Sequence, residues 1–225
     1  MSGIEKDVKD SVLNHCNRGL VPDAQYDPTT EYPISWFTRY FSFLEDETLE
    51  KHLGEAFYQA RFCYKLMETL SLPVAKHKAF VSIQIIQYAS ICEAVLQKCI
   101  EHFYKEMFQQ QYAVKQFQKN QNALSVDTVI MNGSKQLFLC NEKTIKADIK
   151  RERMDHKTQF AVENGIISSD TKQKFDLLYD ARNNVHILKA TQNNYIPRKR
   201  EAKEAFELMQ QFVSEIKLFF ENHSN

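Results

Sequence analysis

Residues 46–73 read DETLEKHLGEAFYQARFCYKLMETLSLP, and the fold class can be inferred from this segment first. Apolar residues recur in it at steps of three and four, as they do on one face of a helix. They are Leu49, Leu53, Phe57, Ala60, Tyr64 and Met67. Pro73 predicts the end of this helix, because proline has no amide donor and restricts the residue before it. The segment therefore predicts one long amphipathic helix that begins at about Asp46.

The segment after Pro73 repeats the same helical period. Its apolar stripe consists of Ile85, Ala89, Cys92, Leu96, Cys99 and Phe103. Two long helices joined by a short connection are expected to pack as an antiparallel pair.

Upstream of these helices, residues 1 to about 33 lack a sustained period and contain three prolines. We interpret residues 1–45 as an irregular arm and residues 46–221 as a helical domain. The end of the arm carries an aromatic cluster that is expected to anchor it on the domain. The cluster consists of Trp36, Phe37, Tyr40, Phe41 and Phe43.

Downstream, Gln109–Asn122 is rich in glutamine and reads as a polar continuation of the helix or as a loop. Val129–Met131 and Leu137–Leu139 then flank Asn132-Gly133, a pair that suits the positive φ angles of a tight hairpin turn. A small β-hairpin at about residues 127–140 is therefore expected as an insertion between helices.

Three more helices follow the hairpin in this interpretation. One runs from Thr144 to about Glu163 and stops at Asn164-Gly165. The next is capped by Ser169 or Asp170 and continues through Lys189. The last follows Pro197 and buries a stripe of Ala202, Phe206, Met209, Val213, Ile216 and Phe220. The predicted fold class is all-α, a bundle of about five helices with a small β-hairpin insertion.

The composition also bears on metal binding and on the cellular location of the protein. The five cysteines form no Cys-x-x-Cys pair, so a disulfide scaffold or a zinc site is not expected, and we predict neither a metal nor another cofactor. Residues 1–10 are polar and charged, unlike a secretory signal, and the longest apolar stretch, residues 83–100, is interrupted by polar side chains. The sequence predicts a cytoplasmic protein without a membrane partner.

The formal charge is balanced, with 29 basic and 29 acidic residues. A protein that binds nucleic acid through a general positive field is usually basic, so any RNA contact is expected to be local. The local candidates are the segment Lys143–Lys157 and the run Arg198, Lys199 and Arg200. The alternative is that each run is simply a solvated helix face.

One stripe of the fourth predicted helix carries groups suited to RNA chemistry, namely Tyr179, Arg182, His186 and Lys189. Arg182 and His186 are four residues apart and project from one face if the segment is helical. Histidine moves protons near neutral pH, and the planar guanidinium of arginine stabilises charge on phosphoryl oxygens. Asn183 could hold the arginine or a phosphate by hydrogen bonds. A structural or solvated role for the pair is the alternative.

Two further observations bear on this pair. Glu93 is the one acidic residue between Phe80 and Ile100, and a carboxylate among apolar neighbours requires a partner, for which Arg182 is the candidate. The alternative places Glu93 at the exposed margin of its stripe. Arg151 and His156 form a second arginine-histidine pair, which we rank below the first because no following helix supports it.

Three segments carry a resemblance to a known family. AVENGIISSD at residues 161–170 and FDLLYDARNNVHI at residues 175–187 resemble the C-terminal half of HEPN domains. YASICEAVL at residues 88–96 resembles the central helix of that family. The resemblance extends over residues 46–221, although its recognisable motifs are confined to these three segments.

The resemblance implies an endoribonuclease that needs no metal and works as a homodimer with a shared cleft. Arg182 and His186 would be its catalytic pair, with Asn183, Tyr179 and Glu93 in support, and with Lys189, Arg198, Lys199 and Arg200 as RNA contacts. The family usually places four to six residues between its arginine and histidine, and this chain has three.

The short spacing keeps a second hypothesis open, a non-catalytic HEPN-like module that binds RNA or protein. Its partner would be an antitoxin or a defence-system protein. A metal-dependent helical enzyme ranks lowest, because the paired Glu-x-x-His motif of carboxylate-bridged metal sites is absent from the sequence.

Overall fold

The computed structural model describes residues 6–17, 34–70, 73–119, 130–132, 135–137, 140–185, 192 and 194–223. The chain divides into two compact units, one formed by residues 1–99 with 154–225 and the other by residues 100–153. Over the described ranges, all strands fall in the second unit, and every other regular element is a helix. The predicted all-α bundle with a β insertion is confirmed.

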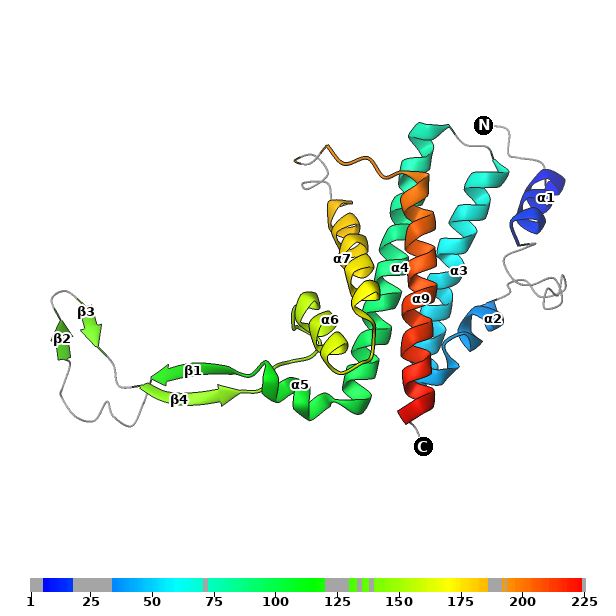
Figure 1. Cartoon of the computed structure of the whole chain (residues 1–225). Coiled ribbons are helices and arrows are strands. Elements are labelled where there is room, and N and C mark those ends of the chain that lie inside the picture. Colours follow the sequence, from blue (N-terminus) through cyan, green and yellow to red (C-terminus); the bar gives the residue numbers. More distant parts are fainter. Residues whose placement is uncertain are drawn as a thin grey trace. The chain divides into compact units, whose positions relative to one another are not determined.

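The first unit is a bundle in which four long helices run side by side (Figure 1). They are α3 (Glu47–Thr69), α4 (Val74–Phe103, whose last four residues belong to the second unit), α7 (Ser169–Asn184) and α9 (Lys199–His223). Shorter helices accompany them: α1 (Lys6–Asn17), α2 (Ile34–Arg39), the 3₁₀ helix η2 (Ser42–Leu44) and α6 (Met154–Glu163).

The first long helix begins where the sequence predicted. The Asp46 side chain accepts a hydrogen bond from the Leu49 amide at 3.1 Å, and the Glu50 side chain accepts one from the Asp46 amide at 3.1 Å. This reciprocal capping satisfies amides that the first turn of a helix leaves unpaired. Asp46 also pairs with Lys98 at 2.9 Å, so the start of α3 is tied to α4.

Phe57 on α3 lies at the centre of the aromatic core. Its ring lies 6.5 Å from that of Tyr88 on α4 and 6.1 Å from that of Phe206 on α9, measured between centroids, so three helices meet there. Phe37 and Tyr40 approach the same ring at 4.9 and 5.4 Å. The predicted aromatic anchor is confirmed.

The expectation of an irregular arm over residues 1–45 is corrected in its described parts. Residues 6–17 form α1 and residues 34–39 form α2, and both helices contact α3. Short helices of this kind are stabilised by tertiary packing of a few apolar side chains, which a search for a sustained period does not detect. The region around the three prolines lies outside the described residues.

The second unit contains α5 (Lys105–Gln111) and two antiparallel strand pairs. Strand β2 (Ile130–Asn132) pairs with β3 (Lys135–Leu137), with Asn132 opposite Lys135, which confirms the predicted hairpin. Strand β1 (Val114–Lys119) pairs with β4 (Cys140–Ile145), with Val114 opposite Ile145. This second ladder was not predicted from the sequence, because apolar and polar residues alternate too weakly over residues 114–119 to indicate a strand.

Two predicted helix boundaries are corrected. The helix expected from Thr144 begins at Met154, because residues 140–145 are strand β4 and Asp148 closes a turn by accepting from the Lys150 amide at 3.0 Å. Asp and Asn side chains commonly stabilise such turns.

The helix expected to run through Lys189 is α7, which ends at Asn184 with Val185 as its C-cap. Asn and β-branched Val are weak helix formers, which accounts for the earlier end. Its N-cap is Ser168, whose hydroxyl accepts from the Thr171 amide at 3.2 Å, in place of Ser169 or Asp170.

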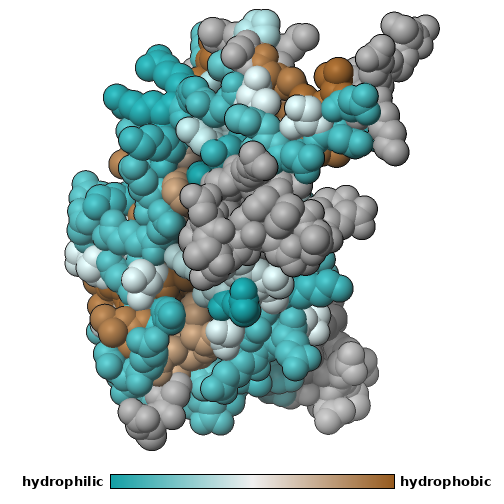
Figure 2. Space-filling model, turned by 90° about the vertical axis from the view of Figure 1, so that its right-hand side faces the viewer, coloured by the Kyte–Doolittle hydropathy of each residue, from teal (hydrophilic) through white to brown (hydrophobic). Residues whose placement is uncertain are grey.

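One helix corrects the expectation about apolar length. His77–Phe103 is long and apolar enough to cross a membrane by length and composition, although half of its most apolar window is buried inside the protein. The core helix of a bundle has the same composition as a membrane span, so this property does not distinguish the two. The face in Figure 2 is hydrophilic over most of its described surface, with apolar side chains gathered in smaller areas.

Candidate functional site

Arg182 and Glu93 form an ion pair that joins α7 to α4. The Nη1 of Arg182 donates to Oε1 of Glu93 at 3.0 Å, and both side chains are about one-quarter exposed, at 26% and 25%. The ion pair predicted between these two residues is therefore formed. A guanidinium held by a charged hydrogen bond keeps a fixed orientation, because its donors lie in one plane.

Tyr179 holds the same guanidinium from a second side. The Cζ atom of Arg182 lies 5.2 Å from the centroid of the Tyr179 ring, three residues earlier on α7. Tyr179 in turn packs beside Phe175, with ring centroids 5.9 Å apart. Since Phe175 is buried, the aromatic column links Arg182 to the core of the bundle.

A second cation, Lys157 of α6, acts on the same carboxylate. Lys157 is only 5% exposed, and its Nζ donates to Oε1 of Gln97 at 3.3 Å. Burial raises the pKa of Glu93, while the charges of Arg182 and Lys157 lower it and only partly offset the burial. The Glu93 carboxylate is therefore shared between the charges of Arg182 and Lys157.

Lys157 was predicted only as the end of the basic segment Lys143–Lys157, and not as a neighbour of Glu93. It lies three residues after Met154 and three before Phe160, both buried, so it occupies the apolar face of α6. A lysine on an apolar stripe is the signal that would have identified it, because lysine is rarely buried without a functional or structural partner.

The start of α7 is fixed by a polar network around Glu215 of α9. Oε2 of Glu215 accepts from the Ser168 amide at 2.7 Å, and Oε1 accepts from the Thr171 hydroxyl at 2.5 Å. Gln211 donates to the Thr171 hydroxyl at 2.7 Å. A carboxylate at a helix N-terminus also complements the helix dipole. The network therefore sets the position of the helix that carries Tyr179 and Arg182.

The remaining predicted catalytic and supporting residues lie at or beyond the end of α7. Asn183 is half-buried in the last turn of the helix. His186 and Lys189 lie outside the described residues. The structure thus brings together Arg182, Tyr179 and Glu93 of the predicted set.

The predicted RNA-binding run at the start of α9 is largely paired with carboxylates. Lys199 forms an ion pair with Glu68 of α3, and Arg200 pairs with Glu204 at 3.0 Å. Arg198 is exposed, and its backbone amide donates to Glu201. Exposed pairs of this kind are weak and exchange readily with another anion.

The second arginine-histidine pair is placed as follows. Arg151 lies in a turn of the second unit, where its Nε is 3.5 Å from Oδ2 of Asp148. His156 belongs to α6 of the first unit. Over the described ranges, no group of three or more His, Cys, Asp or Glu side chains has the arrangement needed to hold a metal ion.

The arrangement around Arg182 can therefore orient a planar cation toward an anion, with a second cation and an aromatic ring alongside. A groove of about 660 Å³ lies between α7 and α9, and its wall includes Leu177, Ala181 and Leu208. Arg182 and Glu93 do not line this groove. No protein-family model, curated protein or solved structure matches the chain, so the candidate site rests on the geometry described above.

Proposed function

We propose that this protein is a HEPN-type, metal-independent endoribonuclease that acts as a homodimer in the cytoplasm. The observation that carries the proposal is the Arg182 guanidinium, fixed by Glu93 at 3.0 Å and by the Tyr179 ring, with Lys157 adding positive charge nearby. Arg182 would contact a phosphodiester of RNA through the N–H groups that Glu93 leaves unused.

In the proposed reaction the 2′-hydroxyl of the ribose attacks the adjacent phosphorus, and the bond from phosphorus to the 5′-oxygen breaks. His186 of one protomer accepts the 2′-hydroxyl proton, and His186 of its partner donates a proton to the leaving 5′-oxygen. Arg182 stabilises the negative charge on the phosphoryl oxygens in the transition state. The products are a 2′,3′-cyclic phosphate and a 5′-hydroxyl.

The other predicted residues act as positioning or binding groups in this proposal. Glu93 and Tyr179 hold Arg182, and Asn183 hydrogen-bonds a phosphate. Lys189, Arg198, Lys199 and Arg200 contact the RNA backbone, for which Lys199 and Arg200 exchange their carboxylate partners for phosphates.

The test compares RNA cleavage by the full-length protein and by single variants in the presence of a chelator. We expect His186→Ala and Arg182→Gln to reduce the rate by about 100-fold or more. The matched control is His52→Ala, because His52 is exposed on α3 and its ion-pair partner among the described residues is Glu55. Undiminished cleavage by His186→Ala would remove this histidine from the mechanism. Loss of cleavage in His156→Ala and Arg151→Gln instead would assign the reaction to the second pair.

A second candidate function is a non-catalytic HEPN-like module that binds RNA or an antitoxin or defence-system protein. Two observations favour it: the charge of Arg182 is already paired with Glu93, and α7 ends at Asn184, before His186. This candidate predicts no turnover of RNA and a stable complex with one protein partner. Recovery of that partner with the purified chain, together with intact RNA after long incubation, would favour it over the nuclease.

A further inference from the structure

Arg61 of α3 is a half-buried cation without a carboxylate partner. Its Cζ atom lies 4.3 Å from the centroid of the Phe206 ring and 5.1 Å from that of Tyr64. None of the ion pairs formed by described residues includes Arg61. A guanidinium that lies over an aromatic ring keeps the N–H groups at its edge available for a bidentate contact with an oxyanion.

Tyr88 of α4 is the polar group next to Arg61. Its side chain is fully buried, and its hydroxyl is closed off from solvent. Burial raises the pKa of Tyr88, and the positive charge and the hydrogen bond of Arg61 oppose that rise. The Tyr88 hydroxyl therefore serves as one acceptor for the guanidinium, whose remaining N–H groups are left for an anion.

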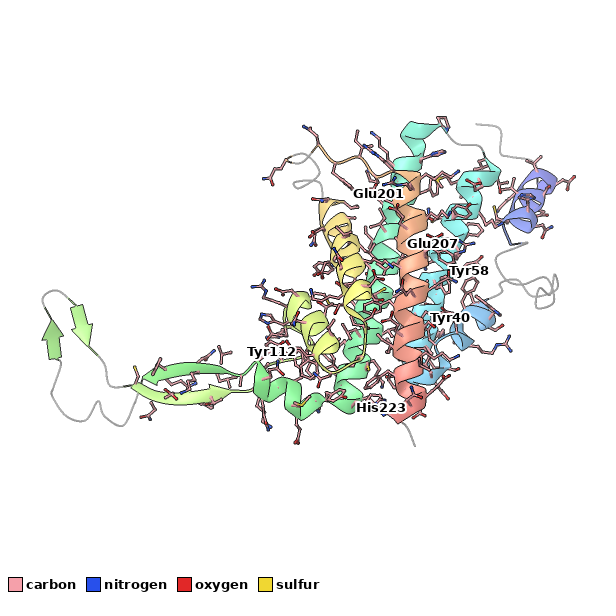
Figure 3. All side chains as sticks on the ribbon, in the orientation of Figure 1. Tyr40, Tyr58, Tyr112, Glu201, Glu207 and His223 are labelled. Atoms are coloured by element: carbon pink, nitrogen blue, oxygen red, sulfur yellow. The ribbon has the colours of Figure 1, made fainter. Side chains whose placement is uncertain are left out.

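A groove of about 510 Å³ opens at Arg61 and is lined by α3, α4 and α9. Its wall includes the three cations Lys199, Arg200 and Lys203 together with the rings of Tyr64 and Phe206. Among the described residues that line this groove, Glu207 is the sole carboxylate, and it lies on α9 (Figure 3). The volume is within the range of small-molecule sites, and cations beside aromatic rings suit a ligand with one anionic and one planar group.

The three α9 cations are available to such a ligand at low cost. They pair with Glu68, Glu204 and Glu207, and their side chains are 50%, 82% and 72% exposed. Exposed ion pairs contribute little, so these lysine and arginine groups can turn toward a bound anion. With Arg61 included, the four cations exceed the three carboxylates by one positive charge.

We propose that this groove binds a nucleoside monophosphate, with the phosphate on Arg61 and the α9 cations and the base beside the Tyr64 ring. A phosphate dianion fits better than a carboxylate, because its three terminal oxygens engage several cations at once. The groove is distinct from the Arg182 site, because Arg182 does not line it, although it shares Lys199 and Arg200 with the proposed RNA contacts.

The test is calorimetric titration of the full-length protein with adenosine 5′-monophosphate, inorganic phosphate and adenosine in separate experiments. We expect the monophosphate to bind, inorganic phosphate to bind more weakly, and adenosine to bind at least about tenfold more weakly than the monophosphate. Arg61→Gln is expected to weaken binding of the monophosphate by about tenfold or more, and Arg61→Lys by less, since lysine keeps the charge but loses the planar fork.

Two further variants keep the test decisive if Arg61→Gln fails to fold. Lys203→Gln changes only an exposed cation of the groove and is expected to weaken binding by about twofold to fivefold. Lys217→Gln is the matched control, because Lys217 is exposed on α9 outside the groove, and its binding is expected to equal that of the wild type.

Several results would overturn the proposal. One is equal binding of adenosine and its monophosphate, and another is wild-type affinity in a folded Arg61→Gln variant. No binding of the monophosphate at millimolar concentration would also contradict it. Binding of a single-stranded RNA that depends on Arg61, without binding of the monophosphate, would assign the groove to a polynucleotide instead.

Discussion

Replacement of Glu215 by Gln should loosen α7, the helix that carries Arg182. The carboxylate uses one oxygen for the Ser168 amide at 2.7 Å and the other for the Thr171 hydroxyl at 2.5 Å. An amide side chain has one acceptor oxygen, so it can satisfy one of these donors and turns its NH₂ group toward the other. Because Thr171 is fully buried, we expect the oxygen to stay with its hydroxyl and the Ser168 amide to lose its partner.

The magnitude follows from these contacts. A hydrogen bond to a charged group contributes about 1.5–3 kcal/mol, and a carboxylate near a helix N-terminus adds about 0.3–1 kcal/mol. Since the Ser168 amide is exposed enough to bind water, the lower part of that range applies. We expect Glu215→Gln to lower the free energy of unfolding by about 2 kcal/mol.

Urea unfolding monitored by circular dichroism measures this change. Glu221→Gln is the matched control, because Glu221 lies on the same helix and forms only an exposed pair with Lys217 at 3.9 Å. Its effect should stay within about 0.5 kcal/mol. If Glu215→Gln were as stable as the control variant, the polar network would not hold α7, and the reasoning about the position of Arg182 would be refuted.

Three further predictions concern other parts of the chain. A Cβ atom on Gly54 would lie 2.6 Å from Oγ1, 2.7 Å from the amide nitrogen and 2.8 Å from Cα of Thr38. Because of this clash, Gly54→Ala should destabilise the protein by about 1–2 kcal/mol, even after the gain in helix propensity. If urea unfolding showed that the variant is more stable, α2 would not approach α3 so closely. Burial raises the pKa of Glu93, so the native state holds that proton more tightly than the unfolded state. The stability of the wild type relative to Glu93→Gln should therefore fall as the pH rises above the ordinary pKa of glutamate, about 4.3, and a rise with pH, measured by unfolding at each pH, would show that the ion pair outweighs the burial. Burial also raises the pKa of Cys99 to about 12 and raises that of Cys92 as well, whereas Cys140 is exposed. A thiol reagent should therefore modify Cys140 in the native protein, and Cys92 and Cys99 only after unfolding, which mass mapping of the labelled protein would show.

The long helices were predictable because their signals are local and repeated. Asp46 caps α3, and the stripe through Phe57 continues for about five turns, so periodicity and capping agree. The Asn132-Gly133 turn likewise predicted its hairpin. The strands β1 and β4 pair residues that are about 20 to 30 apart in the sequence, and β4 is exposed along most of its length, so no apolar alternation marked it.

The candidate site was predictable in part for a related reason. Glu93 stood out as a carboxylate among apolar residues, and a buried charge requires a partner, which led to Arg182. The charge interaction of Lys157 with Glu93 and the Arg61 groove were not predicted, because each depends on helices that meet only in the folded bundle. Whether a cation on a stripe is paired with a carboxylate, an amide or an aromatic ring is decided by the neighbouring helix.

The most direct test of the proposed nuclease uses an RNA oligonucleotide in which the ribose at a mapped cleavage position is replaced by 2′-deoxyribose. Because the 2′-hydroxyl is the proposed nucleophile, the full-length protein should cut the unmodified RNA to a 2′,3′-cyclic phosphate and leave the substituted position intact. Cleavage at the deoxyribose position, or products that carry a 5′-phosphate, would contradict the assignment of Arg182 and His186 to this reaction.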